Sequence, residues 1–194
     1  DRSSAASDVY KRQALQEGMK KPEPTPESMA PAQETSTKPA DESKKLWIDR
    51  YLSVSYPLQR IRITSPYGYR KDPFTGKRKF HGGIDLHARG EQVLAMMEGV
   101  VVKVGQDKTS GKYVTLRHGN YTVSYCHLSR VLAAKGTVVR PRDAVGITGS
   151  TGRSTGEHLH VTCKLNGKNI NPSVLFDYIK SMQQECVSAL AGLL

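Results

Sequence analysis

Residues 113–127 have the sequence YVTLRHGNYTVSYCH, and this stretch decides the fold class. Tyr113–His118 and Tyr121–His127 are short runs rich in β-branched and aromatic residues, which favour strands. The dipeptide Gly119-Asn120 between them tolerates positive φ at low cost, as a two-residue hairpin turn requires. The stretch therefore predicts two antiparallel strands joined by a tight turn, in a fold that is mainly β.

Further short β-rich runs flank this hairpin on both sides, separated by Gly and Pro. Asn166-Gly167 predicts a second tight turn. We expect additional strands at residues 60–64, 93–96, 100–104, 137–139, 145–148 and 158–165. The predicted core is therefore an antiparallel β-sheet.

The last part of the chain predicts one helix over residues 172–190. Asn171-Pro172 has the composition of a helix cap followed by a first helical residue. Apolar side chains then recur at three- and four-residue spacing, which places them on one helix face: Leu175, Ile179, Met182, Cys186 and Leu190.

Residues 1–45 predict a disordered, Pro-rich linker in front of a folded domain at residues 46–180. Five of the ten prolines fall before residue 40, among Glu, Thr, Ser, Gln and Lys, with almost nothing apolar to bury. Asp8–Gln13 resembles a translated transposon end, so residues 1–13 are suspected of being non-native.

The composition limits the class of protein. The formal net charge is +11, and the whole excess lies in residues 46–194 because the first 45 residues hold eight basic and eight acidic groups. Such a surface attracts polyanions without choosing among nucleic acid, anionic lipid and wall polymers. No stretch approaches the roughly 18 consecutive apolar residues of a membrane-spanning helix. The three cysteines, Cys126, Cys163 and Cys186, match no zinc or redox spacing and cannot form a complete disulfide framework.

Two short segments carry most of the chemistry: His81-Gly82-Gly83-Ile84-Asp85 and His158-Leu159-His160. Alternate side chains of a strand share a face, so His158 and His160 should line one cleft while Leu159 points into the opposite layer. A spacing of four places His81 and Asp85 on one side of either a strand or a helix. The two glycines favour a strand or a loop.

Two imidazoles and one carboxylate, with a fourth position left to water, form the ligand set of a catalytic zinc site. The two segments offer four candidate ligands for three places. Two histidines at alternate positions of one strand can hardly bind in the same way, so we expect one of them to bind the metal and its neighbour to handle protons.

Together the motifs resemble those of the lysostaphin/LytM-like zinc endopeptidases of bacterial cell walls. The resemblance rests on H-x-G-x-D at residues 81–85, Y-x-H-L at 125–128 and G-x-x-G-x-S-T-G-x-H-L-H at 149–160. Flanking segments fit as well, and the similarity covers about residues 57–176.

This resemblance implies a duplicated hybrid motif fold with a catalytic groove, in which His81, Asp85 and His160 bind Zn²⁺. It further implies that His127 and His158 flank the metal. We expect His158 to act as general base and then as proton donor to the leaving amine, and His127 to stabilise the oxyanion, although the two roles could be exchanged. The implied substrate is peptidoglycan, in the bacterial cell envelope, with a signal peptide or anchor missing from this chain.

Two other functions compete with a peptidoglycan endopeptidase. An inactive family relative could serve as a scaffold or activator of other wall hydrolases, but every motif position is filled here, which favours an active enzyme. The net charge and Lys77-Arg78-Lys79 would suit a nucleic-acid binder, but no basic recognition helix is recognisable, and no nucleic acid is expected as a partner. The pattern gives no oligomeric state.

Neighbouring polar residues and cysteines are expected to lie outside the site. Glu157, His87 and His118 are predicted to be surface residues. Cys126 and Cys163 are predicted to be small core residues.

Overall fold

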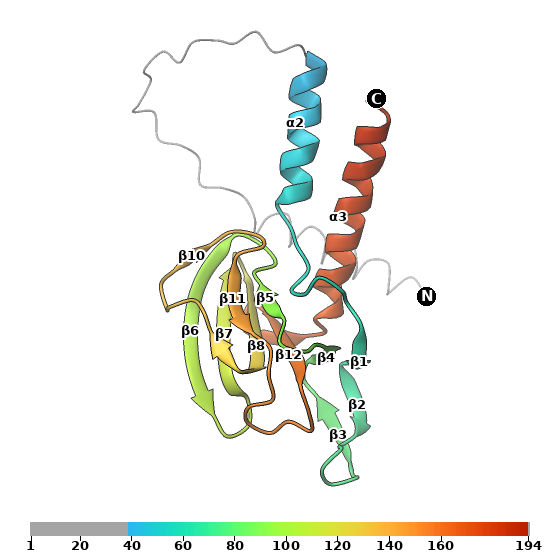
Figure 1. Ribbon diagram of the computed structural model, residues 1–194. Coiled ribbons are helices and arrows are strands. Elements are labelled where there is room, and N and C mark those ends of the chain that lie inside the picture. The colour runs from blue at the N-terminus through green and yellow to red at the C-terminus, as the bar shows by residue number, and fades with distance from the viewer. Residues whose placement is uncertain (1–38, 194) are drawn as a thin grey trace.

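The structure is a computed structural model, and it describes residues 39–193. The helices and strands of this range follow one another in a fixed order along the chain (Figure 1). They are α2 (Pro39–Leu52), β1 (Ile63–Ser65), β2 (Gly68–Lys71), β3 (Arg78–His81), β4 (Ile84–His87), β5 (Gln92–Leu94), β6 (Gly99–Asp107), β7 (Gly111–His118), β8 (Tyr121–Leu128), β9 (Arg130–Val131), β10 (Val138–Val139), β11 (Ala144–Ile147), β12 (His158–Leu165), β13 (Lys168–Ile170) and α3 (Ser173–Ala191).

The main sheet has eight strands in the order β1-β4-β12-β8-β7-β6-β10, with β13 beside β12. A three-stranded sheet, β5-β11-β9, and the β2–β3 hairpin complete the strands of the described range. Every strand pair is antiparallel, which confirms the predicted fold class. The order places β4, β12 and β8 side by side although they are distant in the sequence.

Both predicted tight turns are present. β7 ends at His118 and β8 begins at Tyr121, so Gly119-Asn120 forms the whole connection. Asn166 and Gly167 have φ values of 50° and 79°, the left-handed pair that a type I′ hairpin turn needs. The strand expected at residues 60–64 is shifted to β1, and strands β2, β3 and β9 were not predicted from the sequence.

One face of the main sheet forms the core. Its inward side chains are fully buried, and they alternate with residues of the opposite face as a strand requires: Ile84, Leu86, Leu116, Val123, Tyr125, Leu159, Val161 and Cys163. The apolar face of α3 packs on the same core through Leu175, Phe176, Ile179, Met182 and Cys186. Leu190 is only partly buried. The opposite face of the sheet is left free to carry polar side chains.

Residues 39–45, which the sequence assigned to the linker, form the first half of α2, and the expected domain boundary at residue 46 lies inside that helix. Pro39 begins the helix, acidic Asp41 and Glu42 occupy its first turn and Arg50 its last, as helix ends favour. The rest of the linker, including residues 1–13, lies outside the described residues.

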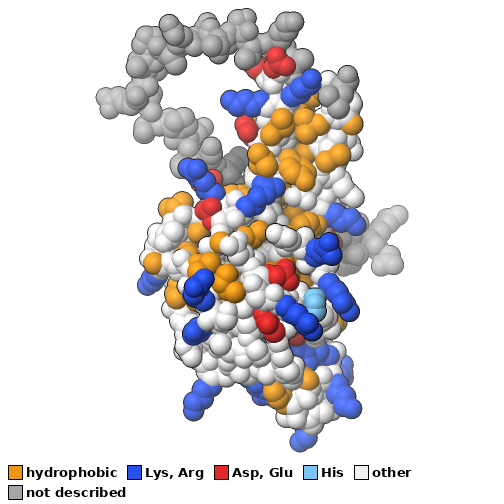
Figure 2. All heavy atoms as spheres, viewed as in Figure 1, with side chains coloured by type: hydrophobic (Ala, Val, Ile, Leu, Met, Phe, Trp, Pro, Cys, Tyr) orange, Lys and Arg blue, Asp and Glu red, His pale blue; other side chains and the backbone are white. Residues whose placement is uncertain are grey.

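Helix α2 packs alongside α3, and the pair projects beyond the sheets (Figure 1). Arg50 joins them, with its Nη2 atom 3.3 Å from Oε2 of Glu185. Apolar side chains gather on the pair (Figure 2), and Leu46, Ile48 and Val187 are exposed there. Within residues 39–193, no helix combines the length and the apolar character that crossing a membrane requires.

Candidate metal centre

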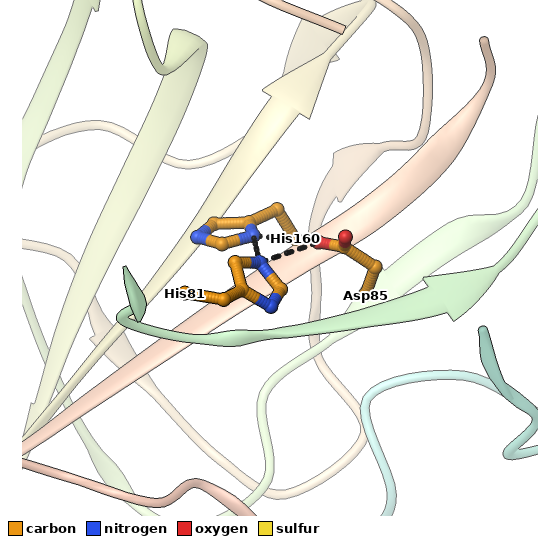
Figure 3. A group of neighbouring side chains, drawn as sticks. All are labelled: His81, Asp85 and His160. Carbon is orange, nitrogen blue, oxygen red and sulfur yellow. Dashed lines mark hydrogen bonds and ion pairs between the residues drawn. The ribbon is translucent and has the colours of Figure 1, made fainter. Parts of the chain in front are cut away.

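Three side chains from three strands converge on one point (Figure 3). His81 is the last residue of β3, Asp85 lies in β4 and His160 in β12. The Nε2 atom of His81 lies 3.2 Å from Nδ1 of His160 and 3.3 Å from Oδ1 of Asp85. The Nδ1 atom of His160 lies 2.7 Å from the same carboxylate oxygen. The structure thus brings together the three residues that the resemblance implied as metal ligands.

The chemistry of these atoms fits a bound divalent cation. Nδ1 of His81 donates a hydrogen bond to the carbonyl oxygen of Pro66 at 2.8 Å, so Nε2 of the neutral ring holds a lone pair. That lone pair faces the carboxylate and the second imidazole. Around a tetrahedral ion with ligands about 2.0–2.1 Å away, neighbouring ligand atoms lie about 3.3 Å apart. The two separations from Nε2 of His81 are close to this value, and the separation between His160 and Asp85, 2.7 Å, is shorter.

Asp85 is held as an anion by its neighbours. Burial opposes its ionisation, but the neighbouring imidazoles of His160 and His81 outweigh that effect and hold the pKa of the carboxyl well below its usual range. The guanidinium of Arg70, in β2, lies 3.6 Å from the other carboxylate oxygen. A carboxylate fixed in this way presents one oxygen to the ligand point and the other to Arg70.

The positions of the three ligands follow from strand register and from one glycine. Asp85 and His160 are directly opposite each other in the β4–β12 pair, so their side chains stand on the same face. The Gly82-Gly83 link turns the chain from β3 into β4. A Cβ atom on Gly83 would lie 2.8 Å from the His160 ring, whereas one on Gly82 would meet nothing within 4 Å. Only a glycine at position 83 leaves room for that imidazole.

Two further imidazoles border the ligand point. The Nε2 atom of His158 lies 3.6 Å from Oδ1 of Asp85, and the His127 ring is 4.8 Å from that of His158 and 5.7 Å from that of His160, between centroids. His158 and His160 share a face while Leu159 is fully buried behind them, as predicted. His127 reaches the site through a φ of 64°, a strained conformation for a residue other than glycine.

Hydrogen bonds fix the tautomers of both rings. Nδ1 of His127 donates to the carbonyl oxygen of Thr151 at 2.8 Å, and Nδ1 of His158 donates to that of Gly156 at 2.8 Å. Each neutral ring therefore carries its lone pair on Nε2. Burial lowers the pKa of His127 and outweighs the hydrogen bond to Thr151, so this ring is neutral at neutral pH.

The ligand point lies in a groove of about 910 Å³. One wall consists of the β2–β3 hairpin and the segment that contains Arg153. An ion pair joins these two parts, with Nη2 of Arg153 3.1 Å from Oδ1 of Asp72. The floor is the polar face of β7, β8 and β12. Six cations line the groove: Arg70, Lys79, Lys103, Lys135, Arg153 and Lys164.

Several residues lie elsewhere than the sequence predicted. His118 is buried at 2% exposure, where its Nδ1 atom donates to the carbonyl oxygen of Glu98, so the prediction of a surface residue is wrong. Cys126 is buried as expected but lies along the groove, because it is directly opposite His160 in the β8–β12 pair. His87 and Glu157 are exposed, as predicted.

Arg70 and the other cations of the groove were not predicted from the sequence. A signal was present: two basic runs, residues 68–71 and 78–81, flank the turn signal Asp72-Pro73-Phe74-Thr75-Gly76. A hairpin there pairs Arg70 with Lys79 across the strands.

Comparison with known proteins agrees with this geometry. Residues 79–172 match peptidase family M23. The chain is 42% identical over 118 residues to the DD-carboxypeptidase/endopeptidase Mpg of Neisseria meningitidis, covering 60% of this chain and 27% of that protein. It is 40% identical over 119 residues to the peptidoglycan DD-endopeptidase ShyC of Vibrio cholerae, covering 60% and 28%. The chain thus spans about a quarter of the length of the curated relatives it matches.

Two solved structures have the same fold. A zinc containing peptidase from Vibrio cholerae superposes with a TM-score of 0.56 at 31% identity, covering 60% of this chain and 37% of that one. The catalytic domain of a mutant of the prophage-encoded M23 protein EnpA from Enterococcus faecalis superposes with a TM-score of 0.54 at 30% identity, covering 63% and 95%.

An antiparallel sheet that carries two imidazoles and one carboxylate in position to hold a metal ion is an arrangement that suits a metallopeptidase. The chain belongs to peptidase family M23.

Proposed function

We propose that this chain is a zinc-dependent endopeptidase that hydrolyses peptide bonds of peptidoglycan. The observation that carries the proposal is the convergence of His81, Asp85 and His160 on one point, with the lone pair of His158 facing the same point. A relative named for peptidoglycan DD-endopeptidase activity and a structural neighbour named as a zinc peptidase support the substrate and the metal. Such a substrate places the proposed activity at the bacterial cell envelope.

His81, Asp85 and His160 would hold the zinc ion. When bound, zinc supplies Lewis-acid polarisation of the scissile carbonyl and a water that ionises near neutral pH. The residues of the chain supply positioning and proton transfer. Asp85 contributes one negative charge and the two neutral imidazoles contribute none, so a bound Zn²⁺ ion would keep a net positive charge.

His158 is the proposed general base. Its Nδ1–H is committed to the Gly156 carbonyl, so the Nε2 lone pair, 3.6 Å from Asp85 Oδ1, can accept a proton from the attacking water. The imidazolium formed in this way can then donate the same proton from Nε2 to the leaving amine. The hydrogen bond to Gly156 holds the ring in one tautomer through both steps.

The tautomer of His127 favours a role other than the oxyanion stabilisation that the sequence suggested. A neutral ring with Nδ1–H bound to Thr151 accepts at Nε2 and cannot donate there. Donation to an oxyanion would need a second proton, and burial, which lowers the His127 pKa, opposes its uptake. We therefore propose that His127 orients the attacking water by accepting a hydrogen bond from it.

A peptide-release assay on purified peptidoglycan tests the proposal, with metal content measured on the same samples. We expect the chain to release peptides, to lose activity with a chelator and to regain it with zinc. His160→Ala should lose both activity and metal. His158→Ala should lose roughly 10²- to 10⁴-fold in rate while it keeps the metal.

The control is His87→Ala, which removes an exposed histidine two residues beyond Asp85 and should leave rate and metal content unchanged. A wild-type chain that is folded and loaded with zinc but releases nothing from peptidoglycan would refute the enzyme and favour a scaffold or activator. Equal metal loss in the His158 and His160 variants would refute the division between ligand and base.

A further inference from the structure

The floor of the groove continues beyond the metal centre as two rows of side chains set by strand register. The first row runs across four strands: Lys103 is opposite Thr115, Thr115 is opposite Ser124, and Ser124 is opposite Thr162. In the second row, Arg117 is opposite Thr122, and Thr122 is opposite Lys164. All of these residues except Arg117 line the groove.

The rows lie at defined steps from the metal centre. His160, Thr162 and Lys164 are alternate residues of β12 and stand on one face. At about 3.3 Å per residue, the first row is about 7 Å and the second about 13 Å from His160 along the strand. An extended peptide advances about 3.3–3.6 Å per residue. A substrate peptide that runs along β12 would therefore bring groups two to four residues from the bond that is cut beside the two rows.

Hydroxyl groups dominate the first row. The Oγ1 atom of Thr115 and the Oγ atom of Ser124 are 2.9 Å apart and hydrogen-bonded to each other, and Thr162 follows on the next strand. Such groups can donate as well as accept hydrogen bonds. Neither row holds a carboxylate.

The cations of the two rows have fewer acidic side chains beside them than the cations near the metal centre. The lining residues of the groove include three acids, Asp72, Asp85 and Asp107. Asp72 is paired with Lys79 and Arg153, and Asp85 faces the ligand point and Arg70. The structure gives Asp72 and Asp85 no contact with either row.

Lys164 and Lys103 differ in their surroundings. Lys164 is exposed, and the ion pairs found within residues 39–193 do not include it. Lys103 lies over the ring of Tyr113, with Nζ 5.2 Å from its centroid, and Asp107 is nearby. Oδ1 of Asp107 accepts hydrogen bonds from the backbone N–H groups of Thr109 and Ser110. Lys164 is therefore the stronger anion-binding group of the two.

We propose that the two rows form a subsite for a free carboxylate of the substrate peptide, located two to four residues from the bond that is cut, with Lys164 as its main cation and Lys103 as its second. The inference rests on the proposed function, whose substrate class it narrows to acidic peptides. Lys164 contributes most of the binding of the carboxylate through charge-assisted hydrogen bonds. The hydroxyls of Thr115, Ser124 and Thr162 bind the peptide backbone.

Two synthetic cross-linked peptides test the subsite. They are identical except at one position two to four residues from the bond that is cut, where one peptide carries a free carboxylate and the other a carboxamide. We expect the wild-type chain to cleave the carboxylate peptide with a kcat/KM about tenfold higher, and the ratio to fall towards one at 1 M salt. In Lys164→Gln with Lys103→Gln the ratio should be near one at low salt. The control Lys180→Gln removes an exposed cation of α3 and should keep the wild-type ratio.

Binding of the two peptides, followed by NMR shifts of the groove residues, separates this inference from the proposed function. Preferential binding of the carboxylate that depends on Lys164, without any cleavage, would keep the subsite and refute the endopeptidase. Equal binding and equal cleavage of the two peptides, or an unchanged ratio in the double variant, would overturn the subsite. The subsite would also be overturned if a short DNA duplex displaced the bound carboxylate peptide at a lower concentration than added free carboxylate peptide does.

Discussion

The substitution Gly83→Ala isolates the effect of geometry on the metal centre, because it adds one methyl group and no charge. The new Cβ atom would lie 2.4 Å from the carbonyl oxygen of Val161 and 2.8 Å from Cε1 and Nε2 of His160. These values fall about 1.0 and 0.6 Å short of the 3.4 Å at which ordinary contact begins. Either the His160 ring or the backbone of β12 must move by that amount.

Displacement of this size exceeds what a metal site tolerates, since ligand distances hold within about 0.2 Å. We expect zinc affinity to fall about 10- to 100-fold, as for other changes that misplace a ligand. Overpacking should also cost about 1–3 kcal/mol in the free energy of unfolding. The measurement is a competition titration against a chromophoric chelator, with circular dichroism to establish that the variant is folded.

Gly82→Ala is the matched control, since its Cβ atom would meet nothing within 4 Å and the residue does not have a positive φ. Its zinc affinity should equal that of the wild type, and its stability should change by less than about 0.5 kcal/mol. A folded Gly83→Ala chain that binds zinc as tightly as Gly82→Ala would refute the argument that His160 is placed by the close approach of β4.

Two further predictions concern buried titratable groups. Burial lowers the pKa of His118, so the unfolded chain takes up a proton first as the pH falls, and the stability contributed by the neutral ring is present above about pH 6.5 and lost below it. The free energy of unfolding, measured in urea at pH 7.5 and at pH 5.5, should fall less between these two pH values in His118→Asn, which can still donate to Glu98, than in the wild type. An equal fall in the two proteins would contradict this. Burial also raises the pKa of the Cys126 and Cys163 thiols to about 12 and raises that of Cys186. Ellman's reagent at pH 8 should find all three thiols unreactive in the folded chain and reactive in denaturant, and rapid reaction of the folded chain would refute the burial.

The parts of the fold that follow local rules could be predicted from the sequence. The turns at Gly119-Asn120 and Asn166-Gly167 depend on backbone preferences of the residues themselves, and the helix face of α3 depends on spacing. Helix α2 could not be predicted, because its first half has the composition of a linker and the helix is stabilised by packing against α3.

The candidate site divides in the same way. Alternation along one strand is enough to place His158 and His160 on a common face. The position of His127 depends instead on a positive φ at the end of β8, and the burial of His118 depends on neighbours from β6. The tautomer on which the proposed role of His127 depends is set by the carbonyl of Thr151, which is 24 residues away in the chain.

We propose above all that His81, Asp85 and His160 hold one metal ion. Elemental analysis and X-ray absorption of the purified, folded chain test it most directly. We expect one zinc per chain with two nitrogen ligands and one oxygen ligand from the protein, retained in His158→Ala and lost in Asp85→Ala. A folded wild-type chain without stoichiometric metal under any loading condition, or Asp85→Ala with a full complement of zinc, would contradict it.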